Sequence, residues 1–128
     1  WTVADYRNIC AATGCTDVML GRGAVADPLL ARRIRDGEEY ATDADWAEIS
    51  GMLAEFWARV QAKLPPHQSP GRLKQWLGMM QRSYPQAEVL YGQIREARKA
   101  PEISLVLDRF GMRPTHVRPR DASQPVAP

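Results

Sequence analysis

A glycine, an arginine and a glycine follow one another at positions 21 to 23, directly after the apolar residues Val18, Met19 and Leu20. A guanidinium group offers a forked set of donors that matches the oxygens of a phosphate. A glycine allows close approach of the backbone and tolerates a positive φ. The segment therefore predicts a phosphate site, with Gly21 at the close approach, Arg22 as the cation and Gly23 in an unusual conformation. On the tripeptide alone, a strand that ends in a tight turn with an exposed arginine is the competing interpretation.

The sequence offers few residues for a metal or a reactive thiol. Cys10 and Cys15 are the two cysteines, and the two histidines, His67 and His116, are distant from them. A structural metal site needs more soft ligands than this, and no histidine or lysine adjoins either cysteine to activate it. We expect no metal, and two reduced, partly buried thiols in a cytoplasmic protein.

Charge is distributed unevenly along the chain. The formal net charge is only +2, but residues 1–58 carry −5 and residues 59–120 carry +8. Such asymmetry points to a polyanionic partner for the second part, although ordinary solvated helix faces would give the same count. No apolar run approaches the roughly 18 residues of a membrane span, so we expect no membrane contact.

The first 36 residues predict a helix, a strand and a second helix. Residues 3–13 have apolar residues at helical spacing, and Gly14 is placed to end that helix in a left-handed conformation. Residues 16–21 predict a short strand, in which Val18, Met19 and Leu20 follow one another without alternation, as is typical of a strand buried on both faces. Asp27 and Pro28 suit the N-cap and first turn of the next helix. One strand cannot make a sheet, so we expect this α/β unit to be a piece of a larger one, and the chain begins at Trp1 and not at a methionine.

After an acidic linker at 37–42, four amphipathic segments predict a helical bundle. They cover about 43–64, 71–84, the residues after Pro85, and 102–110, where Gly111 stops the last. Their apolar stripes comprise Trp46, Ile49, Leu53, Phe56, Trp57, Val60 and Leu64, then Leu73, Trp76, Leu77 and Met80, then Ala87, Leu90, Tyr91 and Ile94, and finally Ile103, Val106 and Leu107. The proline-rich residues 112–128 predict a disordered tail.

Longer strings than the tripeptide resemble the tRNA-dihydrouridine synthases, which are flavoproteins with a (β/α)8 barrel. The resemblance rests on "ATGCTDVMLGRGAVADPLLARRI", on the opening "WTVADYRNICAATG" and on "GRLKQWLGMMQRSYPQAEVLYGQIREARKAPEI". The last string is similar to the C-terminal helical domain of the branch that modifies uridine 16 in the tRNA D-loop. The resemblance implies that 1–36 is the end of a TIM-type barrel, that 37–42 is a linker, and that 43–111 is an all-α domain that binds tRNA.

The resemblance also implies cofactors and the residues that bind them. FMN would be the flavin and NADPH its reductant, with Gly21 and Arg22 at the FMN phosphate. The proton donor of this family is a cysteine on a barrel loop, which matches neither Cys10 nor Cys15, so we expect it outside this chain. The 128 residues alone should therefore lack synthase activity and bind FMN weakly at best.

For tRNA, the resemblance implies contacts by Arg72, Lys74 and Arg95. Met79 occupies another position of that signature, where relatives carry an aromatic residue. On a helical wheel Arg72 and Lys74 flank the apolar stripe of their helix on opposite sides, and packing against the next helix would gather several cations at one edge. Unremarkable helix-surface cations are the competing interpretation of these residues.

Two other functions stay open at this point, namely a non-catalytic helical RNA-binding module and a different FMN-dependent barrel oxidoreductase. The upstream sequence would separate them, since a synthase needs the loop cysteine. The sequence leaves the oligomeric state open, and a monomer is expected.

Overall fold

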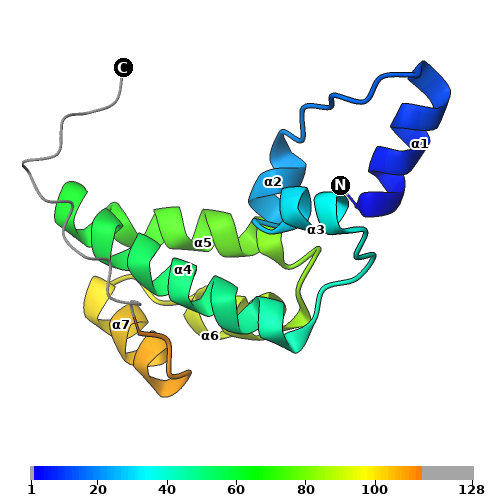
Figure 1. The fold of residues 1–128 in the computed structure, drawn as a ribbon. Helices are drawn as coiled ribbons and strands as arrows, with labels where there is room; N and C mark the ends of the chain where they lie inside the picture. Colours follow the sequence, from blue (N-terminus) through cyan, green and yellow to red (C-terminus); the bar gives the residue numbers. More distant parts are fainter. Residues whose placement is uncertain (1, 114–128) are drawn as a thin grey trace, which may run out of the picture.

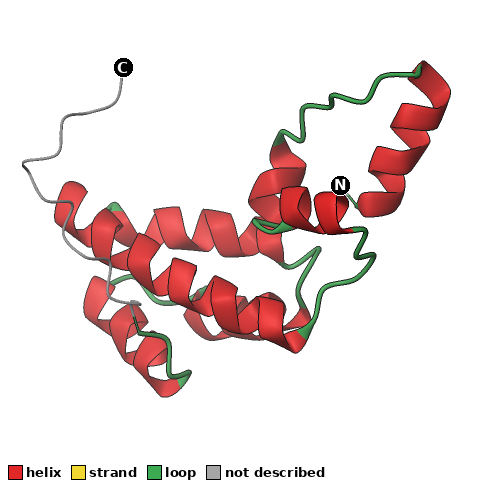
Figure 2. Cartoon of the chain, viewed as in Figure 1, coloured by secondary structure: helices red, strands yellow, loops and turns green. Residues whose placement is uncertain are grey.

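A computed structural model describes residues 2–113, and every regular element in that range is a helix (Figures 1 and 2). The helices are α1 (Val3–Thr13), α2 (Arg22–Ala26), α3 (Leu30–Asp36), α4 (Asp43–Lys63), α5 (Ser69–Met80), α6 (Pro85–Ile94) and α7 (Ala100–Arg109). None of the helices in this range is long and apolar enough to cross a membrane.

Helices α4 to α7 form the predicted bundle around one apolar core. The fully buried side chains of this core come from all four helices and include Ile49, Leu53, Leu73, Leu77, Met80, Leu90, Ile94 and Ile103. Trp46, Phe56, Leu64, Trp76, Tyr91 and Val106 from the predicted stripes are half-buried and pack at the margin of the core. The predicted apolar stripes are confirmed, because each helix turns its periodic face toward the same interior.

Local sequence fixes where these helices begin. Thr42 caps α4 through a reciprocal pair of hydrogen bonds with Asp45, in which each side chain accepts from the other residue's backbone N–H. Proline occupies the first turn of α5, α6 and α7, where its missing N–H costs nothing. Gly111 has a φ of 68° just beyond α7, which ends that helix as the sequence predicts.

One residue that follows α7, Met112, also packs in the core. Met112 is 6% exposed and joins the core cluster, and its N–H donates to the Leu107 carbonyl. The prediction of a tail that starts at 112 is wrong at this residue, because a thioether following the turn at Gly111 reaches the apolar interior. The rest of that predicted tail, 114–128, lies outside the described residues.

The N-terminal part is only partly as predicted. Helix α1 begins at a capping box between Thr2 and Asp5 and ends at Gly14 in the left-handed conformation, as expected. A short helix, α2, was not predicted, and α3 begins at Leu30, later than the Asp27–Pro28 signal indicated. Asp27 instead accepts from the Leu29 N–H and from side chains described below.

The strand predicted at 16–21 does not form. Residues 14–20 have no regular structure, and Met19 is 92% exposed. A strand needs a neighbour to satisfy its backbone groups, and the described part of the chain holds no other strand. The α/β half of the predicted fold class is therefore not seen, and the helical bundle half is.

Helices α2 and α3 rest on one end of the bundle, whereas α1 stands away from it and packs chiefly against α3 (Figure 1). Helix α2 lies along α5. The Trp76 indole N–H donates to the Val25 carbonyl at 2.9 Å and ties the two helices together.

Candidate nucleic-acid interface

The Gly21–Arg22–Gly23 segment opens helix α2. Gly21 has φ 52° and ψ −128°, a conformation that an L side chain adopts only with strain. Nothing lies within 4 Å of where its Cβ would be, so its surroundings are open. Arg22 is exposed on the first turn and forms no ion pair with any described acid.

The expectation for Gly23 is wrong. Gly23 is buried inside α2 with a negative φ, and its N–H donates to the Leu20 carbonyl at 3.0 Å. The Ala24 N–H likewise donates a hydrogen bond to the Gly21 carbonyl at 3.2 Å. The backbone angle of Gly23 therefore does not call for a glycine.

A buried polar cluster, which we call the Arg33 cluster (Asp27, Arg33, Asp45 and Tyr84), joins this N-terminal part to the bundle. Arg33 is 3% exposed. Its Nη2 donates to both Asp27 carboxylate oxygens at 2.8 and 2.6 Å, and to the Tyr84 hydroxyl at 2.8 Å. Its Nη1 donates to Asp45 Oδ2 at 2.5 Å. The Tyr84 hydroxyl in turn donates to Asp27 Oδ1 at 2.7 Å, so three separate parts of the chain meet at one guanidinium.

The electrostatics of the Arg33 cluster favour its charged form. Burial opposes the charge on Arg33, but the hydrogen bonds that Arg33 donates to Asp27 and Tyr84 outweigh this effect, and the pKa of Arg33 is raised. Burial and the hydrogen bond to Asp27 raise the pKa of Tyr84, which stays a neutral phenol. Burial would raise the pKa of Asp45, but bonds from Thr42 and Arg33 lower it. The cluster places one buried cation between two buried carboxylates, and Arg32 also reaches Asp45 Oδ1 at 3.4 Å, so each buried charge has a partner.

Sequence reasoning missed the Arg33 cluster. Asp27 was identified only as a helix cap, and Arg33 and Tyr84 were not singled out. The spacing of Thr42 and Asp45 is a recognisable capping box, but it gives no sign that the carboxylate also meets an arginine. No local signal shows that Arg33 lies inward, because its partners are 6, 12 and 51 residues away in sequence.

Helix α5 carries predicted tRNA contacts on two opposite flanks. On one flank Arg72 and Met79 line a hollow together with Phe56 of α4 and Val25 of α2. On the other flank the Lys74 ammonium donates to the Ala97 carbonyl in the loop between α6 and α7. The expectation that Arg72 and Lys74 flank the stripe is confirmed.

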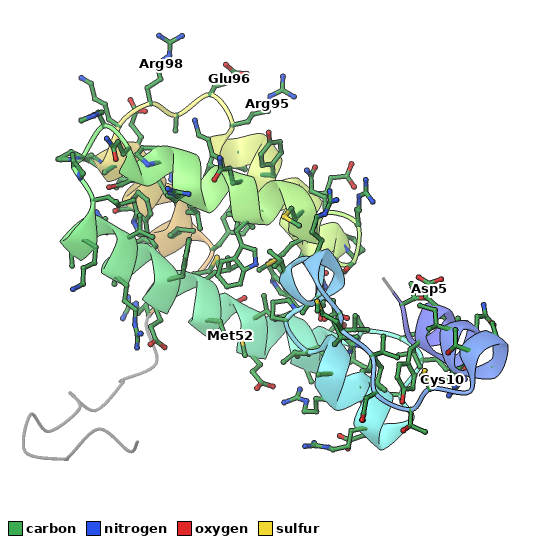
Figure 3. All side chains as sticks on the ribbon, turned by 90° about the horizontal axis from the view of Figure 1, so that it is seen from above. Asp5, Cys10, Met52, Arg95, Glu96 and Arg98 are labelled. Atoms are coloured by element: carbon green, nitrogen blue, oxygen red, sulfur yellow. The ribbon has the colours of Figure 1, made fainter. Side chains whose placement is uncertain are left out.

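The loop at 95–99 brings further cations to the Lys74 flank. Arg95 and Arg98 are exposed and point outward from this loop, whereas Cys10 and Asp5 lie on α1 at the other end of the molecule (Figure 3). Arg95 is paired with neighbouring Glu96 at 3.1 Å, a weak surface contact. The predicted tRNA contacts therefore fall into two groups, Lys74 with Arg95 and Arg72 with Met79. They do not share a single edge, because Arg72 and Lys74 point to different neighbours of α5.

The two cysteines lie in the N-terminal part and are both free thiols. Cys10 is half-buried, as expected, but Cys15 is exposed, which corrects the expectation of partial burial. Its exposure follows from the absence of regular structure at 14–20.

No family model matches the chain. Curated proteins do match it, and several of them are named tRNA-dihydrouridine(16) synthase. The protein of that name from Pseudomonas putida is 44% identical over 110 residues, which is 84% of this chain and 34% of that protein. The one from Ralstonia nicotianae is 42% identical over 109 residues, 84% of this chain and 33% of the relative. The one from Neisseria meningitidis serogroup A is 38% identical over 113 residues, 86% of this chain and 34% of the relative.

These matches place the chain among the relatives of the tRNA-dihydrouridine synthases. It is homologous to one part of the tRNA-dihydrouridine(16) synthases and spans about a third of the length of the curated relatives it matches. The resemblance recognised in the sequence is confirmed.

Proposed function

We propose that this chain is the C-terminal part of a flavin-dependent tRNA-dihydrouridine synthase that reduces uridine 16 in the tRNA D-loop with NADPH. The observation that carries the proposal is the identity of 38–44% over 109–113 residues with proteins of that name. The exposed cations on both flanks of α5 support it, because phosphate contacts by Lys and Arg dominate the affinity of proteins for nucleic acids.

In this proposal the residues at the start of α2 hold part of the flavin. FMN would supply the hydride for reduction of the uridine C5–C6 bond. The open space at Gly21 and the exposed guanidinium of Arg22 fit a phosphate. In this proposal the chain's contribution is to anchor the phosphate end of the flavin.

The bundle would hold the tRNA in the proposed enzyme. Lys74 is fixed by its bond to the Ala97 carbonyl, in the loop that also carries Arg95, so that flank offers two cations to the phosphate backbone. Arg72 and Met79 would contact the tRNA from the other flank. The Arg33 cluster joins these surfaces to α2 and α3, and it would thereby set the distance between the tRNA contacts and the Gly21–Arg22 phosphate anchor.

The experiment that tests the proposal measures tRNA binding by the 128-residue chain over a salt series. An unmodified tRNA transcript would be titrated against the chain and against the triple variant Arg72→Ala, Lys74→Ala, Arg95→Ala. A control variant, Arg7→Ala, Arg35→Ala, Arg109→Ala, removes the same charge from other exposed positions.

We expect the test variant to lose affinity and to reduce the slope of log K against log salt by about 2–3, since each lost phosphate contact removes a little under one unit. The control should bind nearly as the unaltered chain does. Equal binding by both variants would remove these three residues from the interface. Formation of dihydrouridine by the 128 residues alone, or FMN binding at sub-micromolar affinity, would contradict the proposal that this chain supplies only a phosphate anchor and tRNA contacts.

A further inference from the structure

Two adjoining hollows form a groove where α2, α4 and α5 meet. The first has a volume of about 440 Å³ and is lined by Ala24, Val25, Phe56, Arg72, Gln75, Trp76 and Met79. The second, of about 370 Å³, is lined by Phe56, Arg59, Val60, Lys63, Leu64 and Arg72. They share Phe56 and Arg72, and we call the two together the aromatic groove. The first hollow has the size of a small-ligand site.

Two aromatic rings line the aromatic groove in fixed positions. The Phe56 and Trp76 rings meet edge to face, with centroids 4.8 Å apart and planes at 70°. The bond from the Trp76 indole N–H to the Val25 carbonyl fixes the larger ring. Both side chains are half-buried, so part of each remains exposed. Rigid aromatic rings offer contact area with little loss of side-chain entropy.

The charged side chains that line the aromatic groove are all cations. They are Arg59, Lys63 and Arg72, and no described Asp or Glu lines either hollow. Arg59 is paired with Glu55 at 2.5 Å on its own helix. Lys63 and Arg72 have no ion pair with any described acid, which leaves two positive charges beside exposed aromatic surface.

We propose that the aromatic groove binds one unstacked nucleobase of the tRNA, with its flanking phosphates on Arg72 and Lys63. Single-stranded RNA is bound by stacking splayed bases on aromatic side chains and arginine planes, next to cations that follow the backbone. Gln75 is exposed in the lining, and its amide offers both donors and acceptors to a base edge. An apolar protein segment would leave these cations unmatched, whereas a nucleotide matches both the rings and the charges. The inference rests on the proposed function and adds a site on α4 to it.

The test compares variants that alter the aromatic groove with a matched variant that does not. Phe56→Leu removes a ring and keeps an apolar side chain. Gln75→Glu places a carboxylate in the groove without disturbing the core, because Gln75 is exposed. Gln93→Glu is the matched control, since Gln93 is exposed on α6 and lines neither hollow. Each chain would be titrated with unmodified tRNA, a short oligouridylate and a fully paired RNA duplex at one salt concentration.

We expect Phe56→Leu to weaken binding of tRNA and oligouridylate about five- to tenfold, the size of a lost stacking contact. Gln75→Glu should weaken both because its carboxylate repels the phosphates of the bound RNA. Gln93→Glu should change either affinity by less than about twofold, and Phe56→Leu should leave duplex binding unchanged because a paired base offers no free face.

Equal affinity of all four chains for tRNA would overturn the aromatic groove as a base site and leave the proposed function standing. If the unaltered chain binds none of the RNAs, both the proposed function and the inference that rests on it are wrong. Sedimentation of the same chains at the same concentrations tests whether a second copy of this chain occupies the groove instead. A dimer that Gln75→Glu dissociates and Gln93→Glu does not would assign the groove to another copy of this chain, against the proposal.

Discussion

The bundle of α4 to α7 and the N-terminal part, residues 2–36, are held together by different forces. The bundle has an apolar core to which each of its helices contributes fully buried side chains. The N-terminal part buries few large apolar residues and leaves Ile9 and Met19 exposed. It is joined to the bundle by the Arg33 cluster and by the bond from Trp76 to Val25, and Leu29 is its one contribution to the apolar core of the bundle among the described residues. Apolar burial is non-directional and tolerates exchange, whereas a buried ion pair fixes one geometry and fails when a partner is lost.

The largest effect is expected where the two regions are joined. Arg33→Met should destabilise the folded chain by about 3–5 kcal/mol, because Asp27 would be left buried without its counter-charge and Asp45 with the 3.4 Å contact to Arg32 as its only ion pair among the described residues. Arg35→Met is the control, since Arg35 is largely exposed and, among residues 2–113, its one ion pair is with adjacent Asp36. Urea unfolding measures the loss, and equal midpoints for the two variants would show that the Arg33 cluster does not join the regions.

A substitution in the apolar core should destabilise a different set of helices from Arg33→Met. Leu77→Ala removes a side chain that is 0% exposed and should cost about 2–5 kcal/mol. Hydrogen exchange should then increase in all four bundle helices together, whereas Arg33→Met should act first on α2 and α3. Exchange that increases identically for both variants would mean that the two regions unfold as one unit. Leu105→Ala, at a residue 58% exposed on α7, is the control and should stay within about 0.5 kcal/mol.

Removing one hydroxyl should give a smaller effect. Tyr84→Phe keeps the ring that packs against Trp46 with centroids 5.8 Å apart, but it deletes the donor to Asp27 and an acceptor for Arg33. We expect a loss of about 1–3 kcal/mol, the cost of leaving buried partners unsatisfied. Thermal unfolding checks it, and an unchanged midpoint would show that water or a shifted side chain replaces the phenol.

The smallest expected effect is a dependence of folding stability on pH, through the carboxyl group of Asp45. The folded-state pKa of Asp45 is lowered, so its contribution to stability is present above the ordinary aspartate pKa and is lost as pH falls through the folded value. Asp45→Asn should therefore be less stable than the unaltered chain at neutral pH and approach it in strong acid. Urea midpoints at a series of pH values measure the difference, and a difference that does not shrink in acid would contradict the role of this carboxylate. Asp108→Asn, exposed on α7, is a matched control.

The difference between the apolar bundle and the N-terminal part also explains which features could be predicted from the sequence. The apolar stripes around Ile49, Leu77 and Ile94 predicted the bundle correctly, because helical periodicity and burial are local properties of each segment. The strand at 16–21 was predicted from local composition, and the prediction failed because a strand needs pairing partners, which the described part of the chain does not hold. The Arg33 cluster could not be predicted, because a guanidinium is buried only where distant carboxylates happen to converge.

The candidate site divides in the same way. The placement of Arg72 and Lys74 on opposite flanks of α5 followed from helical geometry alone. Their partners did not, since Ala97 and Phe56 belong to other elements. The binding roles assigned to Gly21, Arg22, Arg72, Lys74, Met79 and Arg95 stay predictions until tRNA and FMN binding are measured.

The bond from Lys74 to the Ala97 carbonyl has a consequence for proteolysis. The loop around Ala97 presents Arg95, Arg98 and Lys99 to solvent, which are three peptide bonds of the kind that trypsin cleaves. A protease must draw such a loop into an extended conformation, and loops that can open locally are cut first. Because the Lys74 ammonium holds the centre of the loop against α5, an intact bundle should protect these bonds, and tryptic cleavage there would report that the loop has separated from α5.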